Sequence, residues 1–254
     1  AAALQRDAGA WPWLCAGYAA ASLSMAAIVL WMPRVGVPSS RRIRLFDSFR
    51  HVRADRPFRK LLVCWMLLGT GNLAAVAMFV EYVTNPRYGL GFDAARVGLL
   101  TTSLPMLAFV ACVVGWGILF DRMNFYLLRV AINLLFMAGI ACYYFGSNFG
   151  MLATGMLLHG VARAGGDVAW SLWVTKFAAA ERVAEYMSVH TFLTGCRGVL
   201  APMLAFGVAA SLGPQVMAAA GLVLIILATL MLAPEVRLAR ASRRAYAIER
   251  RPPG

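Results

Sequence analysis

Charged and imidazole side chains stand inside an otherwise apolar stretch of the sequence, 149–175. His159, Arg163 and Asp167 follow one another at intervals of four residues, which places them within about 80° of each other on one side of an α-helix. A carboxylate and an imidazole can take up and release protons when they are buried. A guanidinium holds an anion through paired hydrogen bonds. This pattern predicts a polar stripe that handles protons or an anionic solute.

A second apolar stretch, 186–211, carries His190 and Arg197 seven residues apart and therefore on one face of a helix. Counted from the ends of their stretches, Asp167 and His190 lie at similar depth, so they are expected to pair. Arg163 and Arg197 face a single deep carboxylate, which leaves about one positive charge for a carboxylate or phosphate of a solute. The alternative is structural: Arg163 pairs with Asp167 along one helix, and His190 binds a carbonyl group.

The elements that must position these residues are membrane helices. Of the 254 residues, 61% are hydrophobic and 14% charged, with a mean hydropathy of +0.70, whereas a soluble domain carries about 25% charged residues. The apolar residues form blocks of about 20, the length of a helix that crosses a bilayer. The composition excludes a soluble enzyme domain, a disordered chain and a disulfide-stapled module. We expect an all-α integral membrane protein in the lipid bilayer, with seven helices over 11–33, 61–83, 97–120, 128–146, 149–175, 186–211 and 215–234.

Basic residues indicate how these helices are oriented. Nineteen of the 24 Lys and Arg residues, Arg129 among them, lie in the connections that follow odd-numbered helices or in the C-terminal tail. The positive-inside rule then places the N-terminus outside and the C-terminus in the cytoplasm. The net charge of +13 is therefore a topology signal, and no nucleic-acid partner is expected. In the basic connection 34–60, Ile43, Phe46, Phe49 and Val52 recur at three-residue spacing, as in an amphipathic helix on the membrane surface or, equally, a solvated linker.

Small and helix-bending residues concentrate in the second, third, fifth and sixth predicted helices, the same four that carry polar interiors. Glycine and proline permit close approach and bending of membrane helices. The interruptions are Gly69, Gly71, Asn72, Pro105, Gly165, Gly166, Gly195, Gly198 and Pro202. We expect these helices to enclose one polar cavity. Its predicted substrate and proton pathway consists of Asn72, His159, Arg163, Asp167, His190 and Arg197.

Other chemistries find no support in the sequence. The five cysteines are single and lie within apolar blocks, and the three histidines have no chelating spacing. No nucleophile–base pair and no phosphate-binding loop is recognisable. We therefore expect no metal, no cofactor and no enzymatic activity. A receptor-like seven-helix protein is disfavoured because the last helix lacks an Asn-Pro-x-x-Tyr motif.

One cytoplasmic connection carries a recognisable motif. The segment from Gly117 through Asp121 and Arg122 to Asn124 resembles the Gly-x-Leu-x-Asp-Arg-x-Gly signature of the major facilitator superfamily, except that Asn124 replaces the last glycine. The resemblance implies that Gly117, Asp121 and Arg122 belong to a cytoplasmic gate. It also implies a division of the chain into the last helix of an N-terminal half (1–33), an interdomain loop (34–60), a six-helix C-terminal half (61–234) and a basic tail (235–254).

Proteins of this superfamily bind their solute between two six-helix halves. The resemblance therefore implies a secondary transporter of a small solute in a bacterial inner membrane. The excess of Arg163 and Arg197 over Asp167 adds a preference for an anionic or zwitterionic solute, and Asp167 beside His190 adds proton coupling. The chain would supply one half and one helix of the other, and would need the missing N-terminal half or partner subunits. The alternative is a scaffold or assembly factor of the same fold that transports nothing and works in a larger complex.

Overall fold

The structure is a computed structural model that describes residues 11–31 and 47–249. It divides the chain into two compact units, Ala1–Arg42 and Ile43–Gly254, which we treat separately. In the first unit the described residues form the helix α2 (Trp11–Trp31). The boundary at 42 lies inside the predicted loop 34–60. Ile43 and Phe46 of that loop fall outside the described residues.

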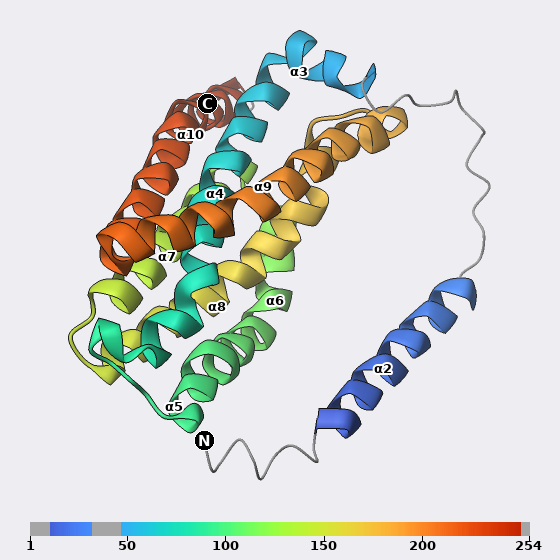
Figure 1. The fold of residues 1–254 in the computed structure, drawn as a ribbon. Helices are drawn as coiled ribbons and strands as arrows, with labels where there is room; N and C mark the ends of the chain where they lie inside the picture. The colour runs from blue at the N-terminus through green and yellow to red at the C-terminus, as the bar shows by residue number, and fades with distance from the viewer. Residues whose placement is uncertain (1–10, 32–46, 250–254) are drawn as a thin grey trace. The chain divides into compact units, whose positions relative to one another are not determined.

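The second unit is built on six long helices joined by short connections (Figure 1). All elements in the described part of the chain are helical, as the sequence predicts. The long helices are α4 (Arg56–Thr84), α6 (Leu104–Arg122), α7 (Phe125–Phe145), α8 (Phe149–Leu172), α9 (Val183–Leu212) and α10 (Pro214–Glu249). The shorter ones are η1 (Asp47–Phe49), α3 (Arg50–Ala54), η2 (Pro86–Tyr88), α5 (Ala94–Gly98), the π-helical turn η3 (Leu99–Ser103), η4 (Trp173–Lys176) and η5 (Ala180–Arg182).

Five helices of the described chain are long and apolar enough to cross a membrane: Arg56–Thr84, Ala94–Arg122, Phe125–Phe145, Ala180–Leu212 and Pro214–Arg237. They support a membrane-embedded protein. The other two predicted spans are not among these five. α2 is a helix of 21 residues without a charged side chain, of which Cys15–Ile28 is the described apolar run, and α8 carries His159, Arg163 and Asp167 within its 24 residues.

The main helix contacts in the second unit run in the order α6–α8–α7–α10–α4–α9. Exchanging α4 with α8, α6 with α9, and α7 with α10 gives the same series read backwards. The segments α4–α6–α7 and α8–α9–α10 are thus two three-helix units that take equivalent places in this series. The spans that contain α6 and α9 stand at the ends of this series and are the least buried of the five.

Glycines allow the helices to meet backbone to backbone. A Cβ atom on Gly71 of α4 would lie 2.4 Å from the carbonyl oxygen of Gly221 on α10. A Cβ on Gly155 of α8 would lie 2.7 Å from the carbonyl oxygen of Gly139 on α7. Real Cβ atoms do not approach a backbone oxygen so closely, so these crossings require glycine.

The end of the basic connection packs against the bundle. Phe49 of η1 lies edge-on to Phe192 of α9, with 5.7 Å between the ring centroids, and His51 of α3 is buried and hydrogen-bonded to Glu185. Asp55 then caps α4 by accepting a hydrogen bond from the backbone N–H of Phe58 at 2.9 Å. These contacts fix α3 on the first turns of α9.

Two helices extend beyond the spans predicted for them. The helix α4 begins at Arg56, ahead of the predicted span 61–83, because the Asp55 cap starts it in the polar sequence just before the apolar run. At the other end, α10 continues through Pro234 to Glu249, where a span ending at 234 was expected. The segment beyond 234 is rich in Arg and Ala, both good helix formers, so the change in polarity does not end the helix.

Candidate functional site

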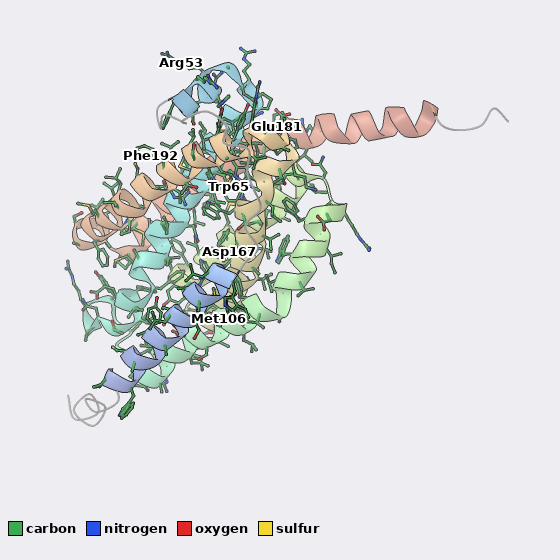
Figure 2. The ribbon with its side chains drawn as sticks, turned by 90° about the vertical axis from the view of Figure 1, so that its right-hand side faces the viewer. Arg53, Trp65, Met106, Asp167, Glu181 and Phe192 are labelled. Carbon is green, nitrogen blue, oxygen red and sulfur yellow. The ribbon has the colours of Figure 1, made fainter. Side chains whose placement is uncertain are left out.

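A polar cavity lies between α4, α7, α8 and α9. Its volume is about 110 Å³, and it is lined by Trp65, Leu68, Gly69, Asn72, Phe136, Gly166, Asp167, Trp170 and Arg197. Three of the six predicted pathway residues, Asn72, Asp167 and Arg197, therefore meet at one place although they come from three helices. In Figure 2, Arg53 and Glu181 mark one end of the bundle, and Trp65 and Asp167 lie further along the helices.

His159 joins this group through Asn72. Its Nε2 atom donates to Oδ1 of Asn72 at 3.0 Å, between α8 and α4. The ring is only 5% exposed, and Phe79 and Phe136 pack edge-on against it with centroid distances of 5.0 and 5.3 Å. The histidine is thus held as a neutral donor in an aromatic pocket directly behind the cavity wall.

Arg163 and Asp167 form an ion pair one helical turn apart, with 3.8 Å between Nε and Oδ2. Both side chains are 58% exposed, and the guanidinium lies 5.7 Å from the ring centroid of Phe109 on α6. The three residues of the predicted stripe on α8 therefore lie in two different environments. His159 turns into the bundle, whereas Arg163 and Asp167 stand on its open face beside the cavity.

Arg197 reaches across from α9 to α4. Its Nη1 atom donates to the backbone carbonyl of Trp65 at 2.9 Å, and the guanidinium occupies the space beside Gly69 where a side chain would otherwise lie. The Nε atom is buried and has no hydrogen-bond partner among the described residues. Arg197 therefore brings a positive charge, only partly satisfied, to the cavity wall.

His190 does not line the cavity, and the expected pair with Asp167 does not form. The imidazole is fully buried among three tryptophans, Trp65, Trp170 and Trp173, with ring-centroid distances of 5.6, 5.5 and 5.3 Å. Its Nδ1 atom accepts a hydrogen bond from Nε1 of Trp173 at 3.2 Å. Similar depth along two helices did not bring the carboxylate and the imidazole together, because the tryptophans surround the imidazole.

Arg129 was assigned to the cytoplasmic connection by its sequence position, but it belongs to the interior. It lies in the second turn of α7, is 0% exposed, and places its guanidinium carbon 3.5 Å from the centroid of the Trp65 ring. None of its three guanidinium nitrogens has a hydrogen-bond partner among the described residues. A helical periodicity would have revealed it, since Arg129 shares a face with Phe125, Leu128 and Ile132, all of them buried.

The predicted gate residues lie at the end of α6, away from the cavity lining. Asp121 and Arg122 are exposed, and neither takes part in an ion pair within the described chain. A Cβ on Gly117 would meet no atom within 4 Å. Any gate contact made by these residues would therefore involve a partner outside the described residues.

Within residues 11–31 and 47–249, no group of three His, Cys, Asp or Glu side chains is placed to hold a metal ion. The chemistry available at the cavity is that of one arginine, one carboxylate, one amide and two tryptophan rings. No protein-family model matches the chain, and no curated protein matches it either.

Proposed function

We propose that this chain is the C-terminal half of a secondary transporter of the major facilitator superfamily and that it moves a small solute in exchange or together with protons. The observation that carries the proposal is the exposed pair Arg163–Asp167 on α8, next to a cavity formed by four helices. An ion pair and a cavity on one open face of a membrane bundle are what a transport pathway requires.

The exposure of the Arg163–Asp167 pair indicates what surrounds this face of α8. A charged side chain in the middle of a membrane helix costs roughly 2.5–3.5 kcal/mol on insertion scales when it meets lipid. Arg163 and Asp167 expose more than half of their side chains, so a lipid-facing α8 would be unfavourable. We infer that this face is turned toward water and toward a second bundle, which the N-terminal half of the complete protein would supply.

The architecture supports the same proposal. Two three-helix units with equivalent contacts form the bundle, and internal repeats are a property of many transporter folds. We propose that α2 and α8 also cross the membrane, which gives seven crossings. By the positive-inside rule, the N-terminus is then external and the C-terminus cytoplasmic, and we place the protein in a bacterial inner membrane.

The test is uptake by the complete protein reconstituted in lipid vesicles with an imposed proton gradient. A library of small carboxylates and zwitterions is offered to wild type, Arg197→Gln and Asp167→Asn. We expect solute uptake in wild type, loss of uptake in Arg197→Gln, and loss of pH dependence in Asp167→Asn. Transport of a solute by both folded variants at the wild-type rate and with unchanged pH dependence would remove these residues from the pathway.

A scaffold of the same fold is the second candidate, because other subunits could cover the open face of α8 as well as a second bundle could. The same preparation separates the two functions. A scaffold co-purifies from mild detergent with other membrane subunits in fixed ratio and shows no gradient-driven uptake. A transporter purifies without them and accumulates its solute.

A further inference from the structure

The interior of the bundle around Trp65 contains several buried hydrogen-bond donors without partners among the described residues. Arg129 has no partner for any guanidinium nitrogen, and the Nε atom of Arg197 and the Nε1 atom of Trp65 are also buried without one among the described residues. His190 adds a fourth donor: because its Nδ1 accepts from Trp173, the neutral ring carries its hydrogen on Nε2, which is unpaired as well.

These donors belong to one cluster. Arg129 lies against the Trp65 ring at 3.5 Å, His190 lies 5.6 Å from the same ring between centroids, and Arg197 is bonded to the Trp65 carbonyl at 2.9 Å. Trp65 thus contacts the Arg129 guanidinium and also lines the cavity, together with Arg197.

The charges of this region do not balance. Among the described residues, Asp167 is the one carboxylate that lines the cavity, and Arg163 pairs with it. Neither Arg129 nor Arg197 has a carboxylate within ion-pair distance in the same part of the chain. Arg129, Arg163 and Arg197 together exceed the charge of Asp167 by two. One of these positive charges lies at the cavity wall and the other against the Trp65 ring.

The position of Arg129 is also unusual for an arginine near the end of a membrane helix. Such a side chain normally extends toward the headgroups, where water solvates its charge. Here it is directed inward and is completely buried. The cation–π contact with Trp65 offsets part of the cost of removing the guanidinium from water, and an anion nearby would offset the rest.

We propose that the cavity is a binding site for a small carboxylate, held by the guanidinium of Arg197 and stabilised by the charge of Arg129, which lies against the Trp65 ring. A cavity of about 110 Å³ has room for a small anion. The proposal rests on the proposed function in one respect, because it names the class of the transported solute. Binding itself can be measured without transport.

The experiment uses the complete protein, purified in detergent, and acetate as the probe. Thermal unfolding is followed while sodium acetate replaces sodium gluconate at constant ionic strength, since gluconate is a much bulkier anion than acetate. Acetamide, a neutral molecule of the same shape, is the ligand control. We expect the unfolding midpoint to rise and saturate with acetate and to stay unchanged with acetamide.

Variants then assign the site. Arg197→Gln and Arg129→Met each remove one positive charge, and we expect acetate to bind about tenfold more weakly or worse. Arg129→Lys keeps the charge and is expected to retain most of the response. Arg96→Gln, which removes an exposed arginine at the other end of the bundle, is the matched control and should bind acetate like wild type.

The outcomes separate this inference from the proposed function. Equal responses to acetate and acetamide in wild type would overturn the site, and so would an unchanged acetate response in folded Arg197→Gln. An unchanged response in Arg129→Met would show that Arg129 only packs against Trp65. If Arg129→Met does not fold, the comparison of wild type with Arg197→Gln still decides. Acetate binding without any uptake in vesicles would keep the site and refute the transporter.

Discussion

Arg197 occupies the space that a side chain at position 69 would take: a Cβ atom on Gly69 would lie 1.7 Å from its Nη1 atom. Two residues further along the same helix, a Cβ on Gly71 would lie 2.4 Å from the carbonyl oxygen of Gly221. The first glycine faces the end of a flexible side chain, and the second faces the backbone of α10. The same substitution at these two positions therefore has different consequences.

Gly69→Ala is expected to impair function more than stability. The added methyl group displaces the Arg197 guanidinium from the Trp65 carbonyl, but the side chain can move, and alanine improves the helix by about 1 kcal/mol. Gly71→Ala instead pushes α4 and α10 apart and should cost roughly 1–3 kcal/mol. Thermal unfolding in detergent and uptake in vesicles measure the two effects. A larger fall in the unfolding midpoint for Gly69→Ala than for Gly71→Ala would contradict this account.

The sequence predicted the lengths of the helices better than the directions of their side chains. The predicted span 128–146 corresponds to α7 (Phe125–Phe145), and 61–83 to α4 (Arg56–Thr84), because hydropathy determines where a membrane helix can lie. The pairing of Asp167 with His190 was inferred from depth alone. Depth does not specify rotation about the helix axis, and in the structure Trp173 is the hydrogen-bond partner of His190.

Arg129 shows a second limit of sequence reasoning. Its place at the start of a predicted span made it one of many basic residues on the cytoplasmic side. The helix begins at Phe125, capped by the Asn124 side chain, so Arg129 already lies in the second turn and on the buried face. Its burial and the packing of Trp65 against it show that the charge belongs to the interior.

The hydrogen bond between Asn72 and His159 is expected to stabilise the contact between α4 and α8. Asn72→Leu leaves the buried imidazole without its partner, which typically costs about 1–3 kcal/mol. The double variant Asn72→Leu/His159→Leu removes both polar groups and should recover part of the loss. Thermal unfolding of the two single variants, the double variant and wild type gives the coupling. Additive losses would show that the two residues contribute independently.

Asp55 is expected to hold together the end of the bundle at which α3 lies. Its Oδ1 atom caps α4 through the N–H of Phe58, and its Oδ2 atom accepts from the hydroxyl of Tyr186 on α9 at 2.9 Å. Asp55→Ala removes both contacts and should lower the stability by about 1–2 kcal/mol. Asp55→Asn retains a capping oxygen and should lose less. Equal unfolding midpoints for Asp55→Ala and wild type would show that this end is held by other contacts.

The open face of α8 can be tested for contact with water in the membrane. We compare Asp167→Cys with Leu134→Cys, an exposed apolar position in the middle of α7, in complete protein whose native cysteines, five of them in this chain, are replaced by alanine or serine. A membrane-impermeant, water-soluble thiol reagent requires an ionised thiol in water. If α8 faces an aqueous pathway, Asp167→Cys reacts in sealed vesicles from the side to which the pathway opens. Leu134→Cys does not react, because lipid surrounds it.

The same labelling distinguishes the possible neighbours of this face. Unfolding in detergent should make the introduced cysteine of each variant reactive, which confirms that its thiol is intact. A saturating concentration of the transported solute should slow the labelling of Asp167→Cys, since Asp167 lines the cavity with Arg197. Failure of Asp167→Cys to react from either side of the membrane would mean that protein or lipid seals the Arg163–Asp167 face. The transport pathway would then have to be abandoned.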